Sequence, residues 1–290
     1  MTDASRIADI RAGDHACLTF TDPEERLDLV AAFVAAGLRA GQRVVCVTDN
    51  LSPPALTGEL TERGLGVEAA ARAGQLDVVS STDTFLAQGS FRSAAMLERV
   101  ASQTVEATRD GFAGLWITSD MCWAARPVSG LDELFSYESQ MNQLLTDSGG
   151  VAVCQYDRQC FDTVTLASVA ASHQRAVAAA TYHDDALLRI CRQYQPPGVR
   201  VSGEIDYRRV EPLTRALSEA LALDDVVHLN LSSLLFLDAA AAGTILQAAA
   251  TLRDGQRMAV RASRQAGKLL QVLGLDDLPA VSLAVVADDR

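Results

Sequence analysis

Apolar residues recur along the first two thirds of the chain in short runs that alternate with longer segments of helical spacing. Such alternation predicts a parallel sheet with helices on both faces. We expect five strands, which are 15–20, 43–48, 75–80, 114–119 and 150–156. We expect five helices, which are 23–40, 54–63, 91–109, 131–145 and 161–180. The pattern therefore predicts a doubly wound, mostly parallel α/β domain.

The pattern changes after a break near residues 181–185. Strands 187–194 and 199–206 flank the segment QPPG, which is typical of a turn. Three helices then alternate with three strands. The helices are 210–221, 239–253 and 265–273, and the strands are 226–231, 257–261 and 281–286. We therefore predict two domains, residues 1–182 and a smaller mixed-sheet α/β domain, 183–290.

The charge balance narrows the choice of partners. The chain has 25 basic and 37 acidic residues and a formal net charge of -12. Such a surface repels phosphate backbones and anionic lipids, so we predict neither nucleic-acid nor membrane binding. The chain has no long apolar run, no leader-like start and no CxxC pair among its six cysteines. These features favour a cytoplasmic protein with reduced thiols.

The loop after the first predicted strand argues against nucleotide binding. It reads TFTDPEER and offers three acids but neither a glycine nor a lysine to a phosphate group. No GxSxG or HExxH motif occurs, and His173 and His183 have acidic neighbours but no nucleophile at a fixed spacing. We therefore predict a protein that is not an enzyme and has no cofactor.

Two groups of residues are candidates for binding a small ligand. His15 and Cys17 are two positions apart on a strand and hence share a face, and with Cys122 and Cys154 they could form a soft-metal or redox site. Free cysteines are more often small buried apolar residues, and we predict no metal site.

The second group follows the predicted strand 114–119, in the segment GLWITSDMCWAARPVSG. Open α/β sheets bind ligands at the carboxyl ends of their strands, so this segment could line an apolar pocket. In the alternative interpretation the segment forms no pocket: Trp116 and Trp123 belong to the core, and Arg126 pairs with Asp120. The candidate ligand-binding residues are His15, Cys17, Asp120, Met121, Trp123, Arg126 and Tyr156.

Several separated motifs of the first domain resemble one known family. GDHACLTF, GFAGLWITSDMCWAARP, YESQMNQLL and VAVCQYDR are similar to motifs of the MEDS domain. That domain is a sensory module similar to a RecA or KaiC core without its nucleotide motif. The resemblance covers about residues 10–180. It implies sensing of a small hydrophobic molecule and implies no catalytic residue.

The second domain resembles a STAS domain of the anti-sigma-factor antagonist type. VRVSGEIDYRRVEPLTRAL and DDVVHLNLSSLLFLDAAAAGTILQAA carry the resemblance. In regulated members of that family a serine follows the aspartate that matches Asp238, but Ala239 stands here and offers no hydroxyl for phosphorylation. Ala241 replaces a usual glycine. The implied partner-binding residues are Glu204, Asp206, Ser233, Asp238, Ala239, Ala240, Ala241 and Thr244.

These resemblances favour a cytoplasmic signalling regulator. Ligand sensing by the first domain would control binding of the second domain to an anti-sigma factor of the serine-kinase type, or to a related protein. In the alternative, the protein is a non-catalytic scaffold or ligand-binding protein whose STAS domain mediates self-association as a homodimer. The departures at Ala239 and Ala241 leave open whether the docking site is retained or has lost its function.

Overall fold

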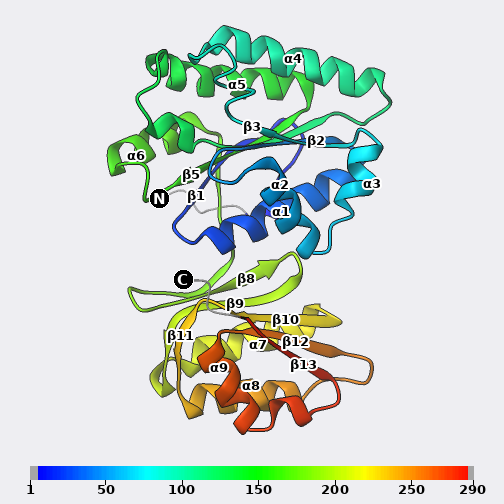
Figure 1. Ribbon diagram of the computed structural model, residues 1–290, viewed down its shortest axis with the longest axis vertical. Coiled ribbons are helices and arrows are strands. Elements are labelled where there is room, and N and C mark those ends of the chain that lie inside the picture. Colours follow the sequence, from blue (N-terminus) through cyan, green and yellow to red (C-terminus); the bar gives the residue numbers. More distant parts are fainter. Residues whose placement is uncertain (1–5, 287–290) are drawn as a thin grey trace. The chain divides into compact units, whose positions relative to one another are not determined.

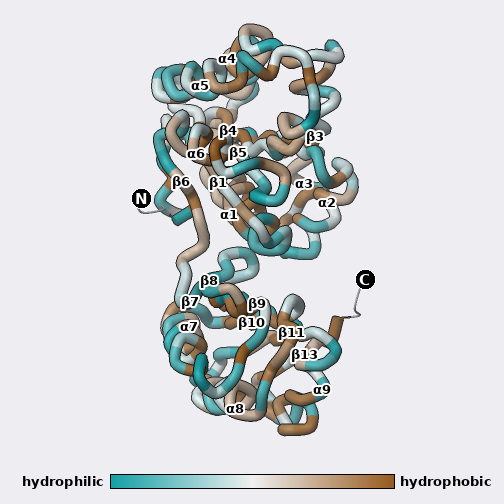
Figure 2. Tube along the Cα trace, turned by 90° about the vertical axis from the view of Figure 1, so that its left-hand side faces the viewer, coloured by the Kyte–Doolittle hydropathy of each residue, from teal (hydrophilic) through white to brown (hydrophobic). Residues whose placement is uncertain are grey.

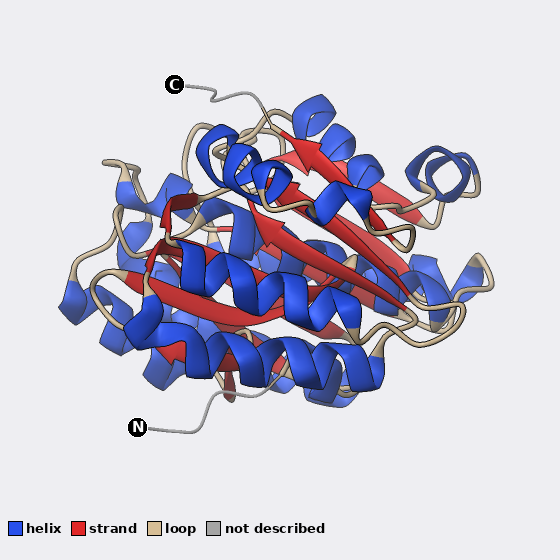
Figure 3. Cartoon of the chain, turned by 90° about the horizontal axis from the view of Figure 1, so that it is seen from below, coloured by secondary structure: helices blue, strands red, loops and turns tan. Residues whose placement is uncertain are grey.

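The chain folds into two compact units, each with its own sheet (Figure 1). The structure is a computed structural model that describes residues 6–286. The division between the units lies between Ala178 and Ala179. Loops join the helices and strands along the chain (Figure 3).

The first unit contains a six-stranded sheet in the order β3-β2-β4-β5-β1-β6. All of its strand pairs are parallel. The strands are β1 His15–Phe20, β2 Arg43–Thr48, β3 Leu76–Ser80, β4 Leu115–Asp120, β5 Val151–Asp157 and β6 Arg175–Val177. Hydrophobic residues gather around β4 and β5 (Figure 2), as expected for parallel strands covered on both faces.

Helices cover both faces of this sheet. Figure 1 shows α4 and α5 on one face and α1, α2 and α3 on the other. The helices are α1 Pro23–Arg39, α2 Pro53–Glu62, α3 Val67–Arg72, α4 Ser93–Arg109, α5 Leu134–Ser148 and α6 Thr163–Ser172. The predicted doubly wound α/β architecture is therefore confirmed.

Helix α1 shows how local sequence fixes an element and its packing. Asp22 accepts hydrogen bonds from the N–H groups of Glu24 and Glu25, at 2.9 and 3.4 Å, and so caps the first turn. Near the other end, a Cβ atom on Gly37 would lie 3.0 Å from Cε3 of Trp116. The glycine therefore lets the helix approach the sheet closely.

The second unit has a mixed sheet in the order β13-β12-β10-β9-β8-β7, with β11 also paired to β9. β7, β8 and β9 are antiparallel neighbours, and the other pairs are parallel. The strands are β7 Thr181–Asp184, β8 Leu188–Tyr194, β9 Pro197–Ile205, β10 Val226–Leu231, β11 Leu234–Leu237, β12 Arg257–Ala262 and β13 Val281–Val285. The helices are α7 Val210–Leu223, α8 Ala239–Ala250 and α9 Arg264–Val272. This is the smaller mixed α/β domain that the sequence predicts.

The main departure from the predicted elements lies just before the second unit. The helix predicted to run to residue 180 ends at Ser172, and β6 follows it. The backbone N–H of Gln174 donates to the carbonyl of His15 at 3.1 Å, and β6 then pairs with β1. Pairing of β6 with the edge of β1 thus outweighs the helical pattern of the alanines and valines in residues 173–180.

Candidate functional site

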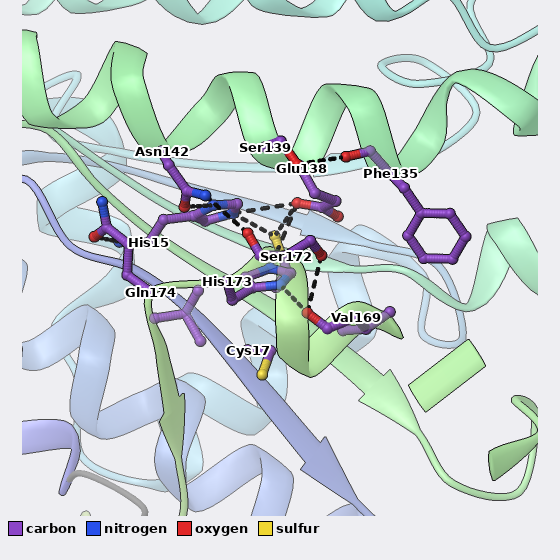
Figure 4. Close-up of polar contacts among 12 residues, drawn as sticks. His15, Cys17, Phe135, Glu138, Ser139, Asn142, Val169, Ser172, His173 and Gln174 are labelled. Carbon is purple, nitrogen blue, oxygen red and sulfur yellow. Dashed lines mark hydrogen bonds and ion pairs between the residues drawn. The ribbon is translucent and has the colours of Figure 1, made fainter. Parts of the chain in front are cut away.

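A buried polar cluster lies between α5 and the strands β1 and β5 (Figure 4). Glu138 Oε2 is 3.2 Å from His15 Nε2 and 3.4 Å from His173 Nε2. Cys154 Sγ is 3.8 Å from the same oxygen and 3.5 Å from His15 Nε2. All four residues are buried, and we call His15, Glu138, Cys154 and His173 the donor cluster.

The fold brings these residues together from four elements. His15 and Cys17 point to one face of β1, and the parallel register places Cys17 opposite Cys154 of β5. Glu138 lies on the buried stripe of α5 and therefore faces this pair of strands. His173 immediately follows α6, where the chain turns toward β1.

Hydrogen bonds orient both imidazoles. Asn142 Nδ2 donates to the carbonyl of Ser172 at 2.8 Å, which leaves Asn142 Oδ1 to accept from His15 Nδ1 at 2.9 Å. His173 Nδ1 donates to the carbonyl oxygen of Val169 at 2.8 Å. Because both Nδ1 atoms are held by these acceptors, the Nε2 atoms of both rings face Glu138.

Burial and the negative charge of Glu138 set the protonation of the cluster. Burial lowers the pKa of His173 to about 4, which keeps this imidazole neutral near pH 7. Burial, and then the charge of Glu138, raise the pKa of Cys154 well above its usual value. Burial acts to raise the pKa of Glu138, but His173, His15 and the Tyr156 hydroxyl hold it below its usual value.

Tyr156 extends the cluster on its other side. Its hydroxyl donates to Glu138 Oε1 at 2.5 Å, so both carboxylate oxygens have neighbours. A cavity of about 30 Å³ lies on the same face of the sheet, beside α4 and α5. Tyr137, Met141 and Cys154 contribute to its lining, so Cys154 belongs both to the cluster and to the cavity wall.

The candidate ligand residues fall into two places. His15 and Tyr156 belong to or contact the donor cluster, and Cys17 Sγ lies 3.6 Å from the carbonyl of Arg175. Met121 and Trp123 are fully buried core residues, and Trp123 stacks on Phe85 with ring centroids 4.9 Å apart.

Asp120 is the last residue of β4, and Arg126 lies shortly after it. The two do not form the pair that the sequence offered as one alternative. Asp120 Oδ2 instead accepts from Arg26 Nη2 at 2.9 Å and from the N–H of Asn50 at 3.1 Å. Arg126 Nη2 pairs with Asp49 Oδ1 at 2.7 Å, and its side chain is 52% exposed. The ion pair of Asp120 therefore joins α1 to β4.

Sequence reasoning missed Glu138 as a site residue, and it considered His173 only as part of an enzyme site. A signal for Glu138 exists in the pattern of α5. The buried residues of this helix are Leu134, Tyr137, Glu138, Met141 and Leu145. An acid on such an apolar stripe requires a buried partner, because an isolated buried carboxylate is costly. A second group of metal-ligand residue types, Cys122, Asp157 and Cys160, is only partly buried.

The candidate partner-binding residues of the second unit surround the start of α8. Asp238 Oδ1 accepts from the N–H of Ala241 at 2.8 Å, and its Oδ2 accepts from the N–H of Tyr207 at 2.8 Å. Ala239 and Ala240 are exposed in the first turn, whereas Ala241 is buried.

Exposed apolar side chains adjoin this helix start. Leu235 and Phe236 of β11 are 70% and 43% exposed, and Phe236 pairs in register with exposed Glu204 of β9. We define the α8 docking surface as Glu204, Tyr207, Leu235, Phe236, Ala239 and Ala240.

The other three candidates are half-buried and make local hydrogen bonds. Asp206 accepts from the N–H of Arg208 at 3.0 Å, and Ser233 accepts from Arg200 Nη2 at 2.9 Å. The hydroxyl of Thr244 donates to the carbonyl of Ala240 at 3.1 Å.

Comparison with known protein families identifies both units. The model of the MEDS family, the MEthanogen/methylotroph, DcmR Sensory domain, matches residues 14–174. This match covers more than half of the chain, so the protein belongs to the MEDS family. The model of the Mlab STAS domain matches residues 188–283. The predicted order of a MEDS domain followed by a STAS domain is therefore confirmed, and these are the domains of a signalling or regulatory protein.

A curated relative supports this assignment at a distance. The chain is 27% identical over 169 residues to the transcriptional repressor DcmR of Methylorubrum extorquens. The alignment covers 57% of this chain and 60% of that protein, so the chain matches less than two thirds of the length of its relative.

Two solved structures are similar to part of the chain. The KaiC-like protein PH0186 of Pyrococcus horikoshii has a TM-score of 0.46 and 13% identity, covering 66% of this chain and 79% of that one. The flagellar accessory protein FlaH of Methanocaldococcus jannaschii has a TM-score of 0.47 and 12% identity, covering 64% and 80%. Within residues 6–286, no helix combines the length and apolarity needed to cross a membrane.

Proposed function

We propose that this protein is a non-catalytic cytoplasmic signalling regulator. Its MEDS domain would sense a small ligand, and its STAS domain would bind an anti-sigma factor of the serine-kinase type through the α8 docking surface. Ligand binding would act by favouring the conformation that binds the partner. The family membership of both domains supports the proposal.

The exposed start of α8 is the observation that carries the docking role. Ala239 lies in the first turn after the capping residue Asp238, and Leu235 and Phe236 are exposed close to it in the chain. Exposed apolar side chains with acidic neighbours suit a protein partner better than a small solute. Because Ala239 has no hydroxyl, phosphorylation at this position cannot switch binding off.

A binding measurement with the full chain tests the surface. The full chain is titrated, one at a time, with the purified anti-sigma factors of the serine-kinase type from the source organism. We expect Ala239→Glu to weaken binding at least about tenfold, equivalent to about 1.4 kcal/mol. Gln247→Glu adds the same charge to an exposed position two turns along α8 and is expected to leave binding unchanged. Equal binding by both variants would show that the surface is assigned wrongly.

A phosphorylation assay tests whether binding lacks control by phosphorylation at position 239. With the bound kinase and ATP, the wild type should take up no phosphate, whereas Ala239→Ser should take up phosphate at position 239. Phosphate on a different serine of the wild type would contradict a permanently available surface. If no anti-sigma factor binds and light scattering shows a stable homodimer that Leu235→Asp dissociates, self-association replaces the proposed role.

A further inference from the structure

We propose that the donor cluster binds one divalent transition-metal ion, with zinc as the expected occupant. The cluster offers two imidazole nitrogens, one carboxylate oxygen and one sulfur, all within 4.8 Å of one another. These are the ligand types that zinc takes in proteins. The inference names a ligand for the sensory domain and rests on the proposed function only for its role in signalling.

Four of the six distances between the donor atoms match the edges of a metal-centred tetrahedron. Bonds of about 2.0–2.1 Å to nitrogen or oxygen and about 2.3 Å to sulfur give edges of about 3.3 Å, or about 3.6 Å where sulfur takes part. The two edges from Glu138 Oε2 to the imidazole nitrogens are 3.2 and 3.4 Å. The edges from Cys154 Sγ to His15 Nε2 and Glu138 Oε2 are 3.5 and 3.8 Å. These four distances suit a bound ion, and all the donor atoms lie within 4.8 Å of one another.

The residues around the donors orient them as they do in metal sites. Asn142 and the carbonyl of Val169 each hold the Nδ1 of one imidazole, so that both Nε2 atoms face inward. Tyr156 donates to the carboxylate oxygen that points away from the imidazoles. Hydrogen bonds of this kind select the ligating tautomer and raise the affinity for the metal.

Burial and charge balance also suit a divalent cation. Side-chain exposure is 0% for His15, Glu138 and His173, and none of the described residues 6–286 forms a hydrogen bond with His173 Nε2. As ligands, two neutral imidazoles, a carboxylate and a thiolate carry two negative charges, which a divalent ion neutralises. Binding removes the proton of the Cys154 thiol and releases it to solvent.

The test uses the full chain without a metal-binding tag. Chain stripped with a chelator is titrated with Zn²⁺ and, separately, with Co²⁺, whose spectrum reports its ligands. We expect one tightly bound ion per chain, visible cobalt bands of tetrahedral intensity and a near-ultraviolet thiolate-to-cobalt band. Failure to bind an ion in this titration, or cobalt bands without the thiolate contribution, would overturn the proposal, and neither outcome requires a variant.

Serine variants locate the ion. Cys154→Ser should abolish the thiolate band and weaken zinc binding at least about a hundredfold. Cys17→Ser changes the buried residue paired with Cys154, and Cys160→Ser changes the second group; both should keep the ion. Loss of binding in Cys160→Ser with retention in Cys154→Ser would move the site away from the cluster. Because metal content and partner binding are measured separately, the metal site and the docking surface can fail independently.

Discussion

Arg26 of α1 and Asp120 of β4 form an ion pair in the interior of the MEDS domain. Arg26 Nη2 lies 2.9 Å from Asp120 Oδ2, and the two side chains are 4% and 0% exposed. Arg26 Nε also donates to Gln155 Oε1 at 2.6 Å, which links α1 to β5 as well. The carboxylate at the end of β4 is therefore already paired and joins a helix to the sheet.

Removing this arginine should destabilise the domain strongly. Arg26→Met leaves the charge of Asp120 buried without its cation, so we expect the free energy of unfolding to fall by about 3–5 kcal/mol. Arg126→Met is the matched control, since Arg126 is 52% exposed and makes a surface pair that contributes at most about 1 kcal/mol. Urea unfolding of both variants measures the difference, and equal losses would argue against a structural role for the buried pair.

Two glycine-to-alanine changes should act in opposite directions. A Cβ on Gly37 would lie 2.8 Å from Val44 Cγ2, so we expect Gly37→Ala to destabilise the protein by about 1–3 kcal/mol. A Cβ on Gly58 of α2 meets no described atom within 4 Å, so Gly58→Ala should stabilise the protein by about 0.5–1 kcal/mol. Thermal unfolding tests both. A gain in stability for Gly37→Ala would mean that α1 can move away from the sheet at little cost.

Cysteine labelling should single out Cys160, the exposed member of the six thiols. Burial raises the pKa of Cys17 to about 11 and that of Cys46 to about 12. The reactive thiolate of Cys17 is therefore only about a thousandth of the total near pH 8. We expect iodoacetamide to modify Cys160 in the native protein and all six cysteines after unfolding in guanidinium, as read by peptide mass spectrometry. Rapid native labelling of Cys46 would indicate that the sheet opens.

The cap of α8 should contribute to the stability of the STAS domain. Asp238→Ala removes the acceptor for the N–H groups of Ala241 and Tyr207, and we expect a loss of about 1–2 kcal/mol. Asp238→Asn keeps one acceptor oxygen, for the N–H of Ala241, but loses the acceptor for the N–H of Tyr207, so it should lose less stability than Asp238→Ala. Chemical unfolding distinguishes the two variants, and similar losses would show that the hydrogen bond to Ala241 contributes little to the helix start.

Sequence patterns predicted the regular elements well where burial and turns act locally. Strands β1, β2 and β10 coincide with the predicted ranges, because apolar runs between clear turn signals define them. β6 was missed because it depends on pairing with β1, which lies far away in the sequence. The partner of Asp120 was likewise beyond local reasoning, since nothing near Arg26 or Arg126 shows which of them the sheet order brings close.

The same limit applied to the donor cluster. His15 and Tyr156 could be selected from strand positions, but Glu138 and His173 reach them only through the packing of α5 and α6. A local pattern could mark Glu138 as unusual without indicating its partners.

The place of β1 in the sheet also constrains how the protein is made. β1 is synthesised well before its partners β5 and β6, with His15 opposite Ala152 and Ala16 opposite Arg175. An emerging chain must therefore hold an apolar strand unpaired until most of the domain has left the ribosome. Such distant pairing slows folding and exposes nascent chains to aggregation. The MEDS domain should consequently fold late and as one unit, and chains that stop before β5 should be recognised by chaperones.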